Sequence, residues 1–186
     1  MKLILKTLLT LVVFSAAACN SEAGSETSKK MLQTSYTRID SCRETVDNVN
    51  AAFSILDCGK LGEHDLQITV QSPTVFTVHL KNGSSEVMSE FEELSGDLPL
   101  ETGPTLEWYS DNHQPRLMVF RVRWGTEEAP FQMNERLVIS HIGIDRICPL
   151  ATVDVQSNKN ANEKARALIY EKFLSISECP ESVLTY

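Results

Sequence analysis

The sequence predicts an α+β domain: mainly an antiparallel sheet, with a C-terminal helix packed on one face and two disulfides. Three observations predict this class. Most of the chain alternates apolar and polar residues at the two-residue period of a strand. One segment near the C-terminus instead repeats apolar residues every three or four positions. The chain contains five cysteines and begins with an export signal, a combination typical of a disulfide-bonded domain.

The first predicted strands are two alternating runs. Apolar and polar side chains alternate through 66–71 and again through 76–81. Ser72-Pro73 predicts a turn between the runs. Asn82-Gly83 predicts a turn after the second run, because both residues tolerate positive φ. Such short links favour antiparallel neighbours.

The later segments complete the sheet and add helices. We expect 84–94 to form a short helix, and the further strands are predicted at 106–109, 118–124, 137–144 and 151–155. The segment 161–176 carries the helical repeat, with Asn160 as N-cap and Glu163 completing a capping box. Pro180 lies beyond its end. The apolar stripe of this helix has to be buried, and the sheet is the expected partner.

Residues 1–18 have the form of a secretory signal peptide. Lys2 and Lys6 make a short basic region, and an uncharged, mostly apolar run follows at 7–18. As a helix, this run would reach about 18 Å, which is short of the ~30 Å hydrocarbon core of a membrane.

The residues that end this signal are compatible with two cleavage sites. Ala16-Ala17-Ala18 satisfies the small-x-small preference of ordinary signal peptidase. The same residues followed by Cys19 resemble the lipobox of bacterial lipoproteins, in which leucine is commoner at the place of Ala16. The resemblance implies cleavage before Cys19, a diacylglycerol on its thiol and a further acyl chain such as palmitate on the new amino group. That number of chains would anchor the protein permanently in a membrane.

The cysteine count favours the lipidated form. An odd number of cysteines in an exported protein leaves one thiol over, and lipidation of Cys19 accounts for it. The remaining four allow three pairings, of which we favour Cys42–Cys58 and Cys148–Cys179 because each closes a local loop. Four free thiols are the alternative. Metal binding is disfavoured because no C-x-x-C pair occurs.

After the signal we expect a flexible tether at 19–35 and a single α+β domain at 36–186. The tether is rich in Ser and Thr and poor in apolar residues. Loss of Lys2 and Lys6 leaves 15 basic and 25 acidic side chains, a net charge near −10. This charge argues against nucleic acid and anionic head groups as partners.

Several short landmarks between residues 36 and 180 resemble a group of exported proteobacterial proteins that have no assigned activity. The landmarks are Cys42, Cys58-Gly59, Glu107-Trp108, Arg123-Trp124, Cys148 and Val153-Asp154. This chain departs from the group at Pro149-Leu150 and at Gln156. The resemblance implies the domain boundaries and supplies no mechanism.

No hydrolase or phosphate-binding motif occurs, so we expect no catalytic residues, cofactor or metal. His141 and Asp145 share a face of a predicted strand, but about 13 Å of extended chain would separate them. His64-Asp65 and Asp111-x-His113 offer metal ligands in polar turns, where such residues are usually solvated. The acidic residues at 86–97 lack the alternation and central Gly of a calcium loop.

Two arginines on one strand make the strongest candidate binding site. The candidate ligand-binding residues are Arg121, Arg123, Trp108 and Trp124. Guanidinium groups about 7 Å apart on one strand face suit a carboxylate or a phosphorylated ligand. The alternative is that the arginines pair with Glu107 or Glu135 across the sheet.

Together these observations predict a lipoprotein of the bacterial cell envelope. Asn20 follows the lipid site, and by the enterobacterial sorting pattern a residue other than Asp there indicates the outer membrane, facing the periplasm. We expect a non-catalytic binding or accessory domain whose partner is an envelope protein or a small anionic ligand. The alternatives are an envelope hydrolase whose site is assembled only in three dimensions, and a passive structural lipoprotein.

Overall fold

The computed structural model describes residues 31–45, 53–71, 75–89, 91, 94, 101–125 and 134–186. The predictions for the signal peptide, Cys19, the first part of the tether and the Ser72-Pro73 turn lie outside these ranges. So do the carboxylates of Glu90, Glu92, Glu93 and Asp97.

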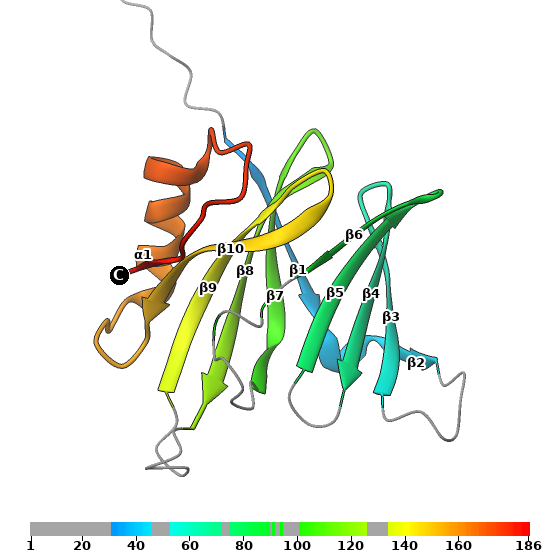
Figure 1. The fold of residues 1–186 in the computed structure, drawn as a ribbon, viewed down its shortest axis with the longest axis horizontal. Coiled ribbons are helices and arrows are strands. Elements are labelled where there is room, and N and C mark those ends of the chain that lie inside the picture. The colour runs from blue at the N-terminus through cyan, green and yellow to red at the C-terminus, as the bar shows by residue number, and fades with distance from the viewer. Residues whose placement is uncertain are drawn as a thin grey trace, which may run out of the picture. The chain divides into compact units, whose positions relative to one another are not determined.

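The described residues form one curled sheet of eleven strands (Figure 1). The strands are β1 (Gln33–Arg38), β2 (Arg43–Thr45), β3 (Phe53–Leu61), β4 (His64–Gln71), β5 (Val75–Asn82), β6 (Ser85–Ser89), β7 (Glu101–Asp111), β8 (Gln114–Trp124), β9 (Asn134–Ile142), β10 (Arg146–Asp154) and β11 (Leu184–Thr185). Their order is β1-β7-β8-β9-β10-β6-β5-β4-β3-β2, with β11 beside β10. Among these strands, the pairings are antiparallel except those of β10 with β6 and with β11.

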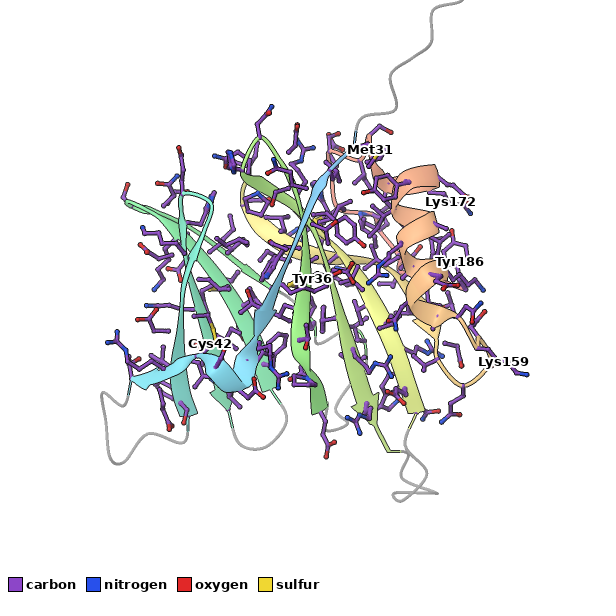
Figure 2. All side chains as sticks on the ribbon, turned by 180° about the vertical axis from the view of Figure 1, so that it is seen from behind. Met31, Tyr36, Cys42, Lys159, Lys172 and Tyr186 are labelled. Atoms are coloured by element: carbon purple, nitrogen blue, oxygen red, sulfur yellow. A yellow bond between two sulfur atoms is a disulfide. The ribbon has the colours of Figure 1, made fainter. Side chains whose placement is uncertain are left out.

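The two edge strands of the sheet are consecutive in the chain. Strand β1 runs into a 3-10 turn, η1 (Ile39–Ser41), which leads directly to β2 at the other edge. Figure 2 shows Cys42 at this corner, and its disulfide partner Cys58 lies in β3. Register shifts between Asp57 and Lys60 and between Thr102 and Leu106 mark bulges, which increase the bend of a strand. The chain therefore links the edges of a curled sheet.

Hydrophobic cores lie on both faces of the sheet. The inner core gathers residues of β3–β10, and its ring cluster joins Phe91 to Phe76 and Phe120, with centroids 5.8 and 4.6 Å apart. The outer core lies under helix α1 (Ala161–Leu168), which continues as a π-helical turn at Ile169–Phe173. Strands β8, β9 and β10 contribute residues to both the inner and the outer core, so they are covered on both faces. The buried part of β10 is accordingly almost continuously apolar.

The C-terminal end of the chain is fixed to the same part of the sheet. Strand β11 pairs in parallel with β10, and the backbone N–H of Tyr186 donates to the carbonyl of Thr152 (2.9 Å). The ammonium of Lys172 lies 4.6 Å from the centre of the Tyr186 ring, and Figure 2 shows both residues beside the helix. These contacts hold the helix and the terminus together on the outer face.

The predicted fold class is confirmed, including the helix on one face and both disulfides, Cys42–Cys58 and Cys148–Cys179. The turn after Asn82 is also present, with Gly83 at φ +60°. The helix predicted at 84–94 is wrong: Ser85–Ser89 forms β6, which pairs with β5 and β10. Tertiary pairing here overrides local helix propensity.

Two boundaries differ from the prediction. Strand β1 begins at Gln33, inside the segment expected to be the tether, because its polar residues pair with β7 through the backbone. Leu32 just before it is buried in the outer core. The helix begins after Asn160 as predicted, but the Asn160 side chain makes no capping hydrogen bond.

Candidate functional site

Four turns of the sheet gather at one end, at the top of Figure 1. They join β3 to β4, β5 to β6, β7 to β8, and β9 to β10. Alternate turns of consecutive antiparallel strands lie at the same end of a sheet, which brings these segments together. We call this end the mouth.

Two turns from distant parts of the sheet touch at the mouth. Gly62, between β3 and β4, has φ +61°, and a Cβ placed on it would lie 2.0 Å from the carbonyl oxygen of His113. His113 and Asn112 form the β7–β8 turn, with φ 65° and 49°. Only glycine permits both this conformation and this close approach. Gly62 therefore closes one side of the mouth.

Beside this contact lies a pocket of about 410 Å³, which we call the mouth pocket. Its lining comes from the four turns and from the segment after the helix: His64, Leu80, Asn82, Ser85, Val87, Gln114, Pro115, Arg116, His141, Ile142, Gly143, Ile144 and Ser177. Cavities of this size are typical of small-molecule sites.

His141 is the most unusual residue of the mouth pocket. It is 3% exposed, lies between Leu117 and Cys148 of the neighbouring strands, and has no hydrogen-bond partner at either ring nitrogen among the described residues. Burial lowers the pKa of His141, and the charge of Arg116 adds to this, whereas the backbones of Ser177 and Arg116 near the ring oppose it. A neutral imidazole with two unused polar atoms is therefore buried in the wall of the cavity.

Two further polar groups of the pocket have unused hydrogen-bonding capacity. The Nδ1 atom of His64 is buried without a partner in the described part of the chain. Arg116 donates to the carbonyl of Ile176 at 3.4 Å and pairs with no described carboxylate. Buried polar groups normally find partners, and among the described residues three of the four buried side-chain atoms that lack one belong to His64 and His141, the fourth being Ser140 Oγ.

The His141–Asp145 pair was predicted to be far apart, and the structure places its members closer together. A turn at 143–145 folds the chain back, so that Asp145 Oδ1 and His141 Cδ2 lie 3.6 and 3.8 Å from the Cβ position of Gly143. Neither imidazole nitrogen bonds to this carboxylate. Ser140 faces away from His141, beside Met118 of the inner core. The three residues do not form a catalytic relay.

The predicted arginine and tryptophan site is not brought together on one surface. Trp108 is fully buried in the inner core and donates from Nε1 to Thr37 (2.9 Å). Arg121 forms an ion pair with Glu135, which confirms the alternative for this residue. Arg123 is exposed on the same strand face. Trp124 packs against the inner core, with the guanidinium of Arg136 5.4 Å from its ring centre.

Glu107, the other acidic residue considered for the arginines, instead attaches the helix to the sheet. It accepts hydrogen bonds from Arg166 of α1 (3.0 Å), Tyr109 (2.8 Å) and Tyr36 (3.3 Å). Burial and this carboxylate raise the pKa of Tyr109 far above its usual range. A groove of about 220 Å³ runs beside Tyr36 and Arg121, but its charged side chains already have partners.

A row of contacting polar side chains that the sequence analysis did not predict lies on the outer face of β4, β5 and β6. His79 Nε2 lies 3.1 Å from Thr69 Oγ1, and its Nδ1 lies 2.8 Å from Glu86 Oε1. Burial raises the pKa of Glu86, but contacts with His79 and Lys81 outweigh it and leave the pKa below its usual range. Cross-strand pairing is the only link among these residues, so no sequence motif could reveal them.

Metal binding finds no support in the described residues, where no three His, Cys, Asp or Glu side chains are grouped to hold an ion. The described helices include none that is long and apolar enough to cross a membrane. Comparison with protein-family models, curated proteins and solved structures finds no match to this chain.

Proposed function

We propose that this chain is a lipid-anchored lipoprotein of the bacterial envelope whose β domain binds a ligand in the mouth pocket without catalysis. The observation that carries the proposal is His141, buried in the wall of a 410 Å³ pocket with both ring nitrogens unpartnered among the described residues. Both nitrogens have no appreciable accessible surface, so a ligand that shifts the ring toward the cavity would supply the missing partners. The imidazole is not oriented by a carboxylate, as a catalytic base normally is.

The cell-envelope part of the proposal rests on the lipobox-like residues before Cys19 and on the two disulfides. Disulfides persist in oxidising compartments such as the periplasm. Sorting to the outer membrane follows from Asn20 and belongs to the same proposal.

Mass spectrometry of the chain purified from membranes tests the anchor. We expect residues 1–18 to be absent, acyl mass on Cys19, and a gain of four hydrogens on reduction because two disulfides open. A soluble protein that retains residues 1–18, or one with five alkylatable thiols, would contradict the proposed localisation.

Thermal-shift screening of small molecules tests the binding role. Ser85 lines the mouth pocket and its neighbour Ser84 does not; both are exposed. We expect the indole of Ser85→Trp to fill the pocket, so compounds that raise the melting temperature of the wild type should not raise that of this variant. The same compounds should still raise the melting temperature of Ser84→Trp. Ligands that stabilise all three proteins equally would show that the site lies elsewhere.

A hydrolase is the second candidate, and the Thr69–His79–Glu86 chain supports it. A hydroxyl, an imidazole and a carboxylate in hydrogen-bond contact form the usual geometry of an activated nucleophile. None of the three residues lines the mouth pocket. Ester hydrolysis by the wild type that is lost in both Thr69→Val and His79→Gln would favour this candidate over a binding role.

A further inference from the structure

The chemistry of the mouth pocket indicates what it binds, provided that the pocket is the ligand site proposed above. We propose that it takes a small monocarboxylate with a short apolar body, whose carboxylate is bound by the guanidinium of Arg116 beside the buried imidazole of His141. The proposal rests on three properties of the lining, namely its donors, its charge and its apolar floor.

The donors of the pocket match a carboxylate. Arg116 has five N–H donors, and the hydrogen bond that its side chain makes to the described residues is the 3.4 Å bond to the carbonyl of Ile176, so most of its in-plane donors remain available. His141 lies close enough for the charge of Arg116 to act on it, but its ring nitrogens have no appreciable accessible surface, so the imidazole affects a bound carboxylate as a nearby titrating charge. Arginine is the side chain best suited to bidentate carboxylate binding.

The charges around the pocket favour a single negative charge. Arg116, from β8, is the one cationic side chain other than histidine in the lining. Asp145 lies beside Gly143 of the β9–β10 turn, where it would repel a dianion. The chain as a whole also carries a formal charge of −8. Phosphate esters and polyanions are therefore disfavoured.

The remaining lining is largely apolar and accounts for the body of the ligand. Leu80, Val87 and Ile142 belong to the inner core where it reaches the pocket, and Ile144 is 97% exposed in the turn above. An exposed isoleucine at the rim of a cavity gives an apolar ligand surface to contact. A carboxylate alone would leave this surface in water.

Binding should be linked to protonation of His141. The groups that face His141 are Arg116 of β8, His64 of β4 and Asp145 of the β9–β10 turn; from β10 it meets Cys148, whose disulfide does not titrate. A bound carboxylate favours the imidazolium, so the pKa of His141 is higher in the complex than in the free protein. Affinity therefore rises as the pH falls through the pKa of the complex.

Isothermal titration calorimetry of the full-length protein with phenylacetate, phenylacetamide and inorganic phosphate tests the proposal. Phenylacetate should bind at least tenfold more tightly than its neutral amide, and more tightly near pH 6 than near pH 8. Phosphate should bind more weakly than phenylacetate. Arg116→Gln should weaken phenylacetate about tenfold to a hundredfold, whereas Arg123→Gln, on the same strand outside the pocket, should not.

The acid–amide comparison needs no variant, so it remains decisive if Arg116→Gln does not fold. Equal binding of acid and amide that Ser85→Trp abolishes would overturn the carboxylate assignment and leave the binding role intact. Absence of any ligand for the pocket, in this titration and in the thermal-shift screen, would overturn both. Tighter binding of phosphate than of phenylacetate would assign the site to a different class of anion.

Discussion

Gly62 shows how one residue sets the geometry of the mouth. Its positive φ and its contact with the His113 carbonyl both depend on the missing Cβ. Gly83 has nearly the same φ, +60°, but nothing lies within 4 Å of its Cβ position. The two glycines therefore separate the cost of backbone conformation from the cost of a steric clash.

We expect Gly83→Ala to lower the free energy of unfolding by about 1 to 2 kcal/mol, the cost of a left-handed conformation. Gly62→Ala should lose a further ~1 to 3 kcal/mol, because its methyl group displaces the β7–β8 turn. Urea denaturation of both variants measures the difference. Equal losses would mean that the two turns are not in contact in solution.

His141 is expected to reduce the stability of the free protein. Replacing it by leucine removes buried polar atoms that have no described partner, so the free energy of unfolding should rise by about 1 to 3 kcal/mol while carboxylate binding loses its dependence on pH. Urea denaturation measures the first effect and titration calorimetry the second. A destabilised His141→Leu variant would show that the imidazole has a structural partner.

The same variant should change how stability depends on pH. The pKa of His141 is lowered in the folded protein, so on acidification the unfolded chain takes up the proton first, near its ordinary pKa of about 6.5. His141 therefore makes stability fall as the pH drops below about 6.5, until the lower folded pKa is passed. His141→Leu should lose this part of the slope, whereas His113→Asn, in the exposed β7–β8 turn, should keep it.

Among the elements, the segment after the helix connects stability to the mouth pocket. The Cys148–Cys179 disulfide ties this segment to β10, and Ser177, two residues before Cys179, lines the pocket. The Cys42–Cys58 disulfide instead holds the corner between the edge strands and does not contribute to the lining.

We therefore expect the two disulfides to differ in function more than in stability. Cys148→Ala with Cys179→Ala should cost about 3.5 kcal/mol and weaken phenylacetate binding; Cys42→Ala with Cys58→Ala should cost about 3 kcal/mol and leave binding unchanged. Urea denaturation and titration calorimetry check each pair. Equal loss of binding in both would show that the disulfides act only through global stability.

The element that the sequence misassigned is also part of the site. Residues 84–94 have a composition that favours a helix, yet Ser85–Ser89 forms a strand because it lies between β5 and the first residues of β10. Its pairing with β10 involves only Arg146–Met88 and Ile147–Ser89, and β11 occupies the same edge of β10 further along. Such a short parallel pairing leaves no local pattern, since its partner lies about 60 positions away.

At the scale of the whole molecule, curling of the sheet creates the mouth. The sequence contains alternating runs and turn residues, and these were sufficient to predict parts of β4, β5 and β7–β10 and one turn of the mouth, at Asn82-Gly83. They could not predict that Gly62 would meet His113, because that contact depends on how far the sheet bends. For the same reason, the residues of the predicted arginine–tryptophan site do not share one surface. Trp108 is buried in the inner core, whereas Arg121 forms an ion pair with Glu135 on the opposite face.

The sequence by itself determined the fold class and the outer helix, and among three possible pairings it favoured the two disulfides that the structure contains, because periodicity and loop length are local properties of the chain. It also carries the lipobox-like signal, which stays a prediction. Only the tertiary structure decided which polar groups lose their partners, since His64, Arg116 and His141 come from three strands and meet where their turns converge. Hydrogen-bond satisfaction is a property of the assembled sheet, so the candidate site could not be read from the chain.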